Sequence, residues 1–188
     1  MGTKGEGNRQ RIVEAAEELF CRRGYNQTSF QDISEATNIP RGNFYYYFKT
    51  KEEILNAVID ARVVELTALL TQFDNDISDP KERLLMFASR LETEGEEIVQ
   101  SGCPTGTLCT ELAKSDFSLH EKSKETFIVL RDWITVQFGL MGSANAGQSA
   151  MDLIARLQGI NVMANVFNDA EYLNRSHLEL LDWIKQQG

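Results

Sequence analysis

The segment from residue 40 to residue 47 concentrates side chains that are suited to contacting nucleic acid. An arginine can pair with guanine or with a phosphate, and an asparagine can reach a base edge or a phosphate. Tyrosines combine a rigid aromatic body with a hydroxyl that suits phosphate oxygens, and a glycine lets the backbone come close to a ligand. The candidate contacts in this segment are Pro40, Arg41, Gly42, Asn43, Tyr45, Tyr46 and Tyr47.

Two predicted helix starts flank this segment and add groups that bind anions. Thr28 and Ser29 lie where a short helix is expected to begin, and Lys51 lies in the first turn of a long one. Unpaired backbone N–H groups at a helix start attract phosphate, and a lysine beside them adds a positive charge. We therefore include Thr28, Ser29 and Lys51 among the candidate DNA contacts.

The elements that position these residues are helices. Apolar residues recur at helical spacing over residues 8–23, and Gly24 follows as a left-handed cap. Thr28 and Gln31 fit a T-x-x-Q capping box for a second helix that ends near residue 38. Asn38 tolerates the left-handed conformation of a tight turn, and Ile39 is expected to tuck beneath it. Two short helices that are joined by such a turn predict a helix-turn-helix.

Pro40 is expected to open the third helix, which is predicted over about Arg41 to Phe48. Phe44 and Phe48, four residues apart, are expected to face inward. Three consecutive helical positions span about 200°, so the three tyrosines cannot all be buried. We expect Tyr45 and Tyr46 to point outward and Tyr47 to be partly buried.

Residues 28–54 resemble the DNA-binding signature of the tetracycline-repressor (TetR) family, and the resemblance extends over about residues 9–60. It departs at Asn38, where the family usually has Gly, and at Tyr47, where His is frequent. The resemblance implies a helix-turn-helix domain over 1–52 and a helical effector-binding and dimerisation domain over 53–188. It further implies a homodimer through the last two long helices, a palindromic double-stranded DNA operator and release by an unknown small-molecule effector. Repression and activation remain open.

Beyond residue 75 the sequence predicts a series of amphipathic helices and hardly any strand. The expected ranges are 80–100, 105–115, 119–141, 147–168 and 171–186. With the four earlier helices this gives an all-α fold of about nine helices. The predicted helix boundaries carry an error of about two to four residues.

Composition is consistent with a protein of the bacterial cytoplasm. No stretch approaches the roughly 18 apolar residues of a membrane span, and the first residues lack a signal-peptide core. Three cysteines form no disulfide framework, as expected in a reducing compartment. The net charge is −9, but residues 1–56 hold eight basic and eight acidic residues, so the whole excess lies in the remainder. The acidic total therefore neither supports nor excludes DNA binding.

A second motif, Gly-Cys-Pro-Thr-Gly-Thr-Leu at 102–108, places Cys103 just ahead of a predicted helix. It resembles the G-C-x-x-G-x-L segment of a regulator subset that includes the repressor of N-ethylmaleimide reductase, which senses electrophiles and oxidants through a cysteine. A helix start can lower the pKa of a thiol, so Cys103 is a candidate sensor; a small buried residue in a tight turn fits equally well. The other effector candidates are large apolar residues on central helices, for each of which plain core is the favoured interpretation: Phe87, Leu91, Phe127, Trp133 and Met163.

The sequence gives little support to catalysis or to a metal or cofactor. It contains no phosphate-binding glycine loop, no nucleophile elbow and no recognised ligand set that includes its two histidines. The alternative from another class is a thiol-dependent redox enzyme that uses Cys103. That alternative leaves the signature at 28–54 unexplained, so we expect a regulator and not an enzyme.

Overall fold

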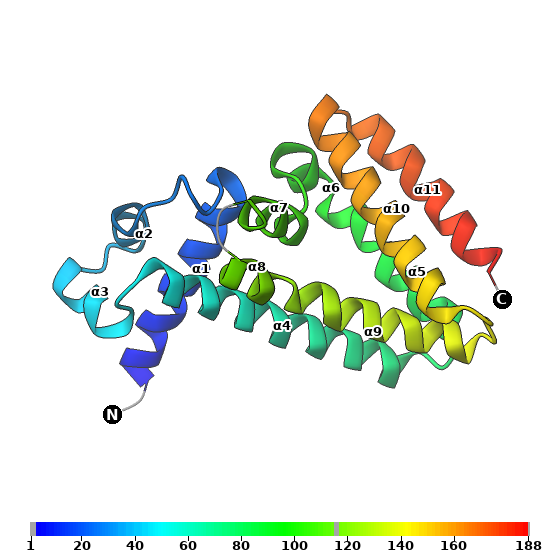
Figure 1. The fold of residues 1–188 in the computed structure, drawn as a ribbon, viewed down its shortest axis with the longest axis horizontal. Helices are drawn as coiled ribbons and strands as arrows, with labels where there is room; N and C mark the ends of the chain where they lie inside the picture. The colour runs from blue at the N-terminus through cyan, green and yellow to red at the C-terminus, as the bar shows by residue number, and fades with distance from the viewer. Residues whose placement is uncertain (1–2, 115–116, 188) are drawn as a thin grey trace. The chain divides into compact units, whose positions relative to one another are not determined.

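The computed structural model describes residues 3–114 and 117–187, and all regular secondary structure within them is α-helical. This confirms the predicted all-α class. Eleven helices are present in the described residues, compared with the nine or so expected (Figure 1). They are α1 (Thr3–Arg23), α2 (Phe30–Thr37), α3 (Arg41–Tyr47), α4 (Lys51–Asp76), α5 (Pro80–Ala88), α6 (Arg90–Ser101), α7 (Pro104–Leu112), α8 (Phe117–Ser123), α9 (Glu125–Leu140), α10 (Ala146–Phe167) and α11 (Ala170–Lys185).

The two additional helices arise because two expected long helices are each interrupted near a serine. The Ser89 hydroxyl donates to Leu85 O at 2.9 Å between α5 and α6, and the Ser123 hydroxyl donates to His120 O at 2.8 Å between α8 and α9. A serine hydroxyl that bonds a carbonyl of the preceding turn commonly bends a helix. The apolar residues keep their helical spacing on both sides of each break, so the spacing alone does not predict it.

The chain packs as two compact units. The first contains Met1–Val64 and Thr107–Glu125, and the second contains Glu65–Gly106 and Thr126–Gly188. These packing units differ from the sequence-predicted domains in two respects, since residues 53–64 and residues 107–125 both pack with the helix-turn-helix. Leu108, Leu112 and Leu119 from the second of these segments are buried in the core of the first unit.

The turns of the helix-turn-helix follow the expected residue chemistry. Gly24 ends α1 in the left-handed region at φ +83°, and Asn38 caps α2 in the same region at φ +53°. Ile39 is 5% exposed beneath that turn. Pro40 is the N-cap of α3, and the helix begins at Arg41, as predicted.

Two phenylalanines anchor α3 to the first unit. Phe44 is fully buried and Phe48 is 3% exposed, which confirms the predicted inward face. The Phe44 ring packs edge-on against Phe30 of α2, with centroids 4.7 Å apart. Because both anchors lie on one side of the helix, the opposite side faces away from the core.

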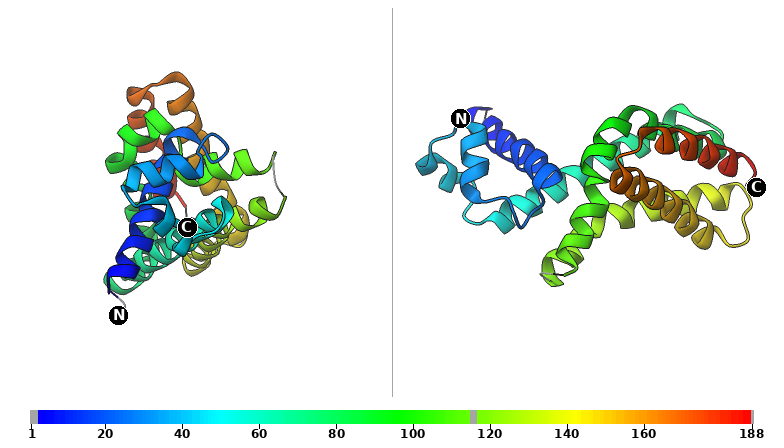
Figure 2. Two further views of the ribbon diagram at one scale, coloured as in Figure 1. Left: turned by 90° about the vertical axis from the view of Figure 1, so that its left-hand side faces the viewer. Right: turned by 90° about the horizontal axis from the view of Figure 1, so that it is seen from above.

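In the second unit, α10 and α11 lie side by side (Figure 2). Leu153 and Ala164 of α10 and Leu173 of α11 are buried in the core of this unit. Asn168 joins the two helices in the left-handed conformation, and the Asp169 side chain caps α11 by accepting from Tyr172 N at 2.8 Å. A short connection of this kind gives an antiparallel pair.

Phe44→Ala should lower the free energy of unfolding by about 3–5 kcal/mol, because it removes a fully buried ring and leaves a cavity. The neighbouring Tyr46 is 80% exposed, so Tyr46→Ala should change stability by no more than about 0.5 kcal/mol. Chemical denaturation at one fixed protein concentration measures both. Equal losses for the two variants would contradict this assignment of inner and outer faces.

Candidate nucleic-acid interface

The outer face of α3 presents polar and aromatic side chains. Gly42 and Asn43 are exposed, Tyr45 is 48% exposed and Tyr46 is 80% exposed. Tyr47 is half-buried, as expected. The side chain of Arg41 lies outside the described part of the structure, although its backbone begins the helix. This face can therefore offer an amide and phenol hydroxyls to a ligand.

Two of the three tyrosines are held in place by neighbouring side chains. The Tyr45 ring stacks on Phe30 at a centroid distance of 5.1 Å and an interplanar angle of 24°. Asn8 of α1 donates its side-chain N–H to the Tyr47 hydroxyl at 3.3 Å. Asn8 is a positioning residue that the sequence analysis did not identify, since no local pattern links it to a residue 39 positions away.

The start of α2 differs by one residue from the prediction. Ser29 is the N-cap: its hydroxyl accepts from Asp32 N at 3.1 Å, and the Asp32 carboxylate accepts from Ser29 N at 2.7 Å. Hydrogen bonds from the Ser29 side chain and then its backbone hold the pKa of Asp32 below its ordinary value. The predicted pairing of Thr28 with Gln31 is wrong, because Gln31 donates to Glu35 instead.

Thr28 itself is fully buried in the first unit. Its hydroxyl donates to Gly24 O at 2.8 Å, across the turn that joins α1 to α2. A side chain that is used in this way stabilises the turn and has no surface to offer a phosphate. We therefore remove Thr28 from the candidate contacts and retain the exposed Ser29.

Lys51 is half-buried, and its ammonium group bonds the protein. Its Nζ donates to Tyr25 O at 2.9 Å and to Thr28 O at 3.0 Å, and it lies 4.1 Å from the centroid of the Tyr25 ring. Burial lowers the pKa of Lys51, while the negative charge of Glu111 opposes that shift. An ammonium group has three donors, so two bonds to carbonyls leave one for a phosphate.

Thr50 caps the start of α4 by accepting from Glu53 N at 3.1 Å. The Glu53 carboxylate completes the arrangement by accepting from Lys49 N at 2.7 Å instead of from Thr50 N. Arg11 of α1 donates to Thr37 O at 2.7 Å. These bonds fix the ends of the helices that flank α3.

Cys103, in the second unit, precedes α7 and is half-buried. Its sulfur accepts from Gly106 N and from the Gln158 side-chain amide, each at 3.4 Å. A Cβ on Gly106 would lie 2.3 Å from the Gln158 side-chain oxygen, so a side chain at this position would require the Gln158 amide to move. Cys109 is buried and donates to Ser123 O, and Cys21 contacts Arg62. Of the three thiols, Cys103 is the one at a helix start.

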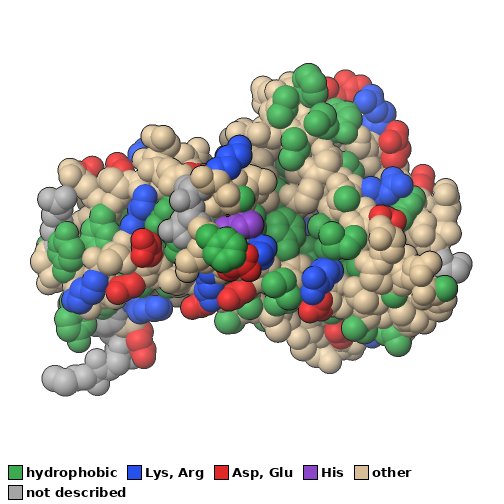
Figure 3. All heavy atoms as spheres, in the orientation of Figure 1, with side chains coloured by type: hydrophobic (Ala, Val, Ile, Leu, Met, Phe, Trp, Pro, Cys, Tyr) green, Lys and Arg blue, Asp and Glu red, His purple; other side chains and the backbone are tan. Residues whose placement is uncertain are grey.

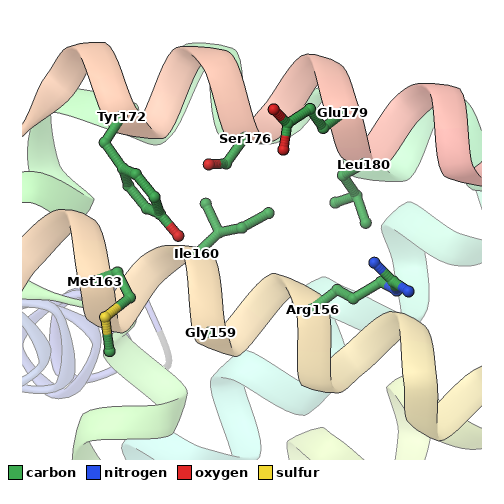
Figure 4. A pocket seen from close by; sticks show the side chains of 8 residues that line it. All are labelled: Arg156, Gly159, Ile160, Met163, Tyr172, Ser176, Glu179 and Leu180. Carbon is green, nitrogen blue, oxygen red and sulfur yellow. The ribbon is translucent and has the colours of Figure 1, made fainter.

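The predicted effector residues are not gathered in one place. Phe87 and Trp133 pack with ring centroids 6.0 Å apart, and the half-buried Phe127 belongs to the same core. The side chain of Leu91 lies outside the described part of the structure. Met163 is 41% exposed and lines an open cavity of about 290 Å³ between α10 and α11 (Figure 4). The structure therefore separates Met163 from the aromatic candidates.

Two further properties concern the described residues as a whole. No described helix combines the length and the apolar character that a membrane crossing requires. Within the same residues, no three metal-binding side chains of the His, Cys, Asp and Glu types come together.

Comparison with known proteins identifies relatives of this fold and sequence. Residues 12–58 match the profile of the bacterial regulatory proteins of the tetR family. An uncharacterized HTH-type transcriptional regulator in the lacX 3′ region of Lactococcus lactis subsp. lactis is 30% identical over 182 residues, covering 92% of this chain and 90% of that protein. The HTH-type transcriptional repressor DhaR of Mycobacterium sp. (strain GP1) is 33% identical over 107 residues, which are 56% of this chain and 52% of DhaR.

The reduced form of NemR from E. coli has the same fold. Its crystal structure superposes with a TM-score of 0.81 at 19% identity, covering 93% of this chain and 95% of that one. The named relatives are regulators, which does not favour the alternative of a thiol enzyme. The sequence relatives and the helix-turn-helix with its exposed α3 face lead to one assignment: the chain belongs to the tetR family of bacterial regulatory proteins and is a helix-turn-helix transcriptional regulator.

Proposed function

We propose that this protein is a homodimeric repressor that binds a palindromic operator in the bacterial cytoplasm and is released by a small-molecule or electrophile signal. The observation that carries this proposal is the outward face of α3, where Asn43 and two tyrosines are exposed opposite two buried phenylalanines. A short helix held from behind in this way suits the major groove of DNA. The repressor role is further supported by the name of the relative DhaR.

Several groups around α3 would divide the work of DNA binding. The side chains of Arg41 and Asn43 would contact base edges or phosphates, and the tyrosine hydroxyls would bond phosphates. A Cβ on Gly42 would meet no protein atom within 4 Å, so the space in front of it is open to a ligand. The proposed contacts are Ser29, Pro40, Arg41, Gly42, Asn43, Tyr45, Tyr46, Tyr47 and Lys51.

The outer side of α10 supports a dimer. Apolar side chains gather at its C-terminal end (Figure 3), with Val166 65% exposed and Phe167 71% exposed. Val162 and Met163 extend this surface by one turn. Apolar patches of this kind on a regulator mark an interface. We therefore propose that α10 and α11 form the interface of the homodimer.

Cys103 supplies the proposed route for an electrophile signal. Its thiolate would add to the electron-poor alkene carbon of a maleimide, forming an S–C bond, while the adjacent carbon takes up a proton. The sulfur now accepts from Gly106 N, in a space bounded by Gln158. An alkyl group on this sulfur would compete with these two contacts, and we infer that it would shift the start of α7.

DNA fragments selected from the source genome by the purified protein should share an inverted repeat. The centres of its half-sites should lie about 34–36 Å apart, or a multiple of that spacing, because a two-fold dimer presents α3 to successive major grooves. Phe167→Glu should abolish both the dimer, measured by sedimentation, and the selection of repeats. Leu140→Glu, at an apolar position on α9 that is 63% exposed, is the control and should do neither. Recovery of unrelated fragments would reject the proposed function.

Lys51→Ala should weaken binding of the operator and of random DNA by similar factors. It should also flatten the slope of log K against log salt by about one unit, since one phosphate contact is lost. Lys124→Ala is the matched control, because Lys124 lies in the same unit and pairs with Glu121. Fluorescence anisotropy at several salt concentrations measures the slopes. A slope unchanged by Lys51→Ala would mean that the third donor of the ammonium group does not contact DNA.

Treatment with N-ethylmaleimide should lower the operator affinity of the wild-type protein by about tenfold, and Cys103→Ser should remove that response. A coupling free energy of this size is typical of allosteric regulators. Cys21→Ser controls for the other partly accessible thiol and should respond like the wild type. A normal response in Cys103→Ser, or none in the wild type, would refute the role of this thiol.

A further inference from the structure

A carboxylate from α7 holds the turn between α1 and α2. One oxygen of Glu111 accepts from Tyr25 N at 2.9 Å, and the other accepts from Asn26 N at 2.7 Å. All three residues belong to the first packing unit. Hydrogen bonds to a charged acceptor are about twice as strong as those between neutral groups, and here two of them act on successive amides. Glu111 therefore fixes the backbone of this turn.

The turn is shaped to receive this carboxylate. Gly24 adopts φ +83°, and successive N–H groups beside a left-handed residue form a concave site for an anion. A Cβ on Gly24 would lie 3.0 Å from a Glu111 oxygen, so a side chain there would crowd the carboxylate. The glycine thus serves both the backbone conformation and the approach of Glu111.

The opposite side of the same turn is held by a cation. Lys51 donates to the carbonyl oxygens of Tyr25 and Thr28. The residue after Thr28 is the N-cap Ser29, so the turn leads directly into α2. A negative group from α7 and a positive group from α4 together set where α2 begins, and α3 follows α2 through a three-residue turn.

The geometry points to Glu111 as a positioning residue for DNA binding, through which a displacement of α7 is carried into the helix-turn-helix. α7 is one continuous helix that starts at Pro104, directly after Cys103, and its Leu108 and Leu112 are buried in the core of the first unit. A shift at the start of α7 would move Glu111 with it. The backbone of the turn would then either move with the carboxylate or lose its two hydrogen bonds to Glu111. This inference rests on the proposed function, since it describes how that function is regulated.

Reciprocity supplies a test that does not depend on the physiological signal. If α7 and the DNA-binding surface are coupled, operator binding must alter the start of α7 by the same free energy by which α7 alters operator binding. The Cys103 thiol reports on that position whether or not it is the natural sensor. We would measure its rate of alkylation by N-ethylmaleimide in the full-length protein by peptide mass spectrometry, with and without saturating operator.

Alkylation that proceeds from the displaced position of α7 has a rate proportional to the population of that position. Operator should therefore slow alkylation of Cys103 in the wild type by about fivefold or more, the lower range of allosteric coupling. Glu111→Gln keeps the shape of the side chain but loses its charge and one acceptor, so the operator effect should fall below twofold. Glu121→Gln makes the same chemical change on α8, where the glutamate contacts Lys124, and should behave like the wild type. The operator concentration that saturates each variant is chosen from the measured operator affinity of that variant.

Hydrogen exchange of the peptide covering residues 24–28 is the second measurement, made without DNA. Glu111→Gln should speed exchange of the Tyr25 and Asn26 amides by about tenfold, while Glu121→Gln should leave it unchanged. Unchanged exchange in Glu111→Gln, or an operator effect that survives the substitution, would overturn the inference. Absence of an operator effect in a wild type that binds DNA would also overturn it. A wild type that binds no DNA would reject the proposed function, and the exchange experiment would still decide whether Glu111 holds the turn.

Discussion

The burial of Phe44 and Phe48 is the constraint on which the proposed DNA-binding surface depends. α3 has only seven residues, far fewer than an isolated helix needs to be stable in water. Its stability must therefore come from packing, and the contact of Phe44 with Phe30 provides it. Two anchors four residues apart also fix the rotation of the helix about its axis. The exposure of Asn43 and Tyr46 follows from that rotation and needs no interaction of their own.

Features that depend on near neighbours in the chain could be predicted from the sequence. The left-handed residues Gly24 and Asn38 and the inward pair of phenylalanines each follow from a few adjacent residue types. The start of α2 could not be fixed to one residue, because Thr28 and Ser29 are both good N-caps. The choice between them is made by burial: Thr28 lies inside the first unit and bonds Gly24 O, which leaves Ser29 at the helix end.

Features that depend on distant parts of the chain could not be predicted in this way. Asn8 meets Tyr47 across 39 positions, and Glu111 meets Tyr25 across 86. Helical periodicity assigns an apolar face to a helix but does not say what will cover it. Met163 shows this limit, since its sequence pattern fits an effector contact or a core position, whereas its side chain is 41% exposed on α10. Packing decides such cases, and packing is a property of the whole chain.

Electrostatics in the first unit acts mainly on the protein itself. Arg11 and Lys51 donate to backbone carbonyls, and the buried Arg62 pairs with Glu17 at 2.6 Å. Since residues 1–56 also carry no net charge, long-range attraction to DNA is weak and recognition depends on a few well-placed groups. The residues that would contact DNA and the residues that hold them are thus different sets. A substitution in the second set would change DNA binding through position and not through charge. Under the proposed role of Glu111, an acidic residue would for that reason favour binding to a polyanion.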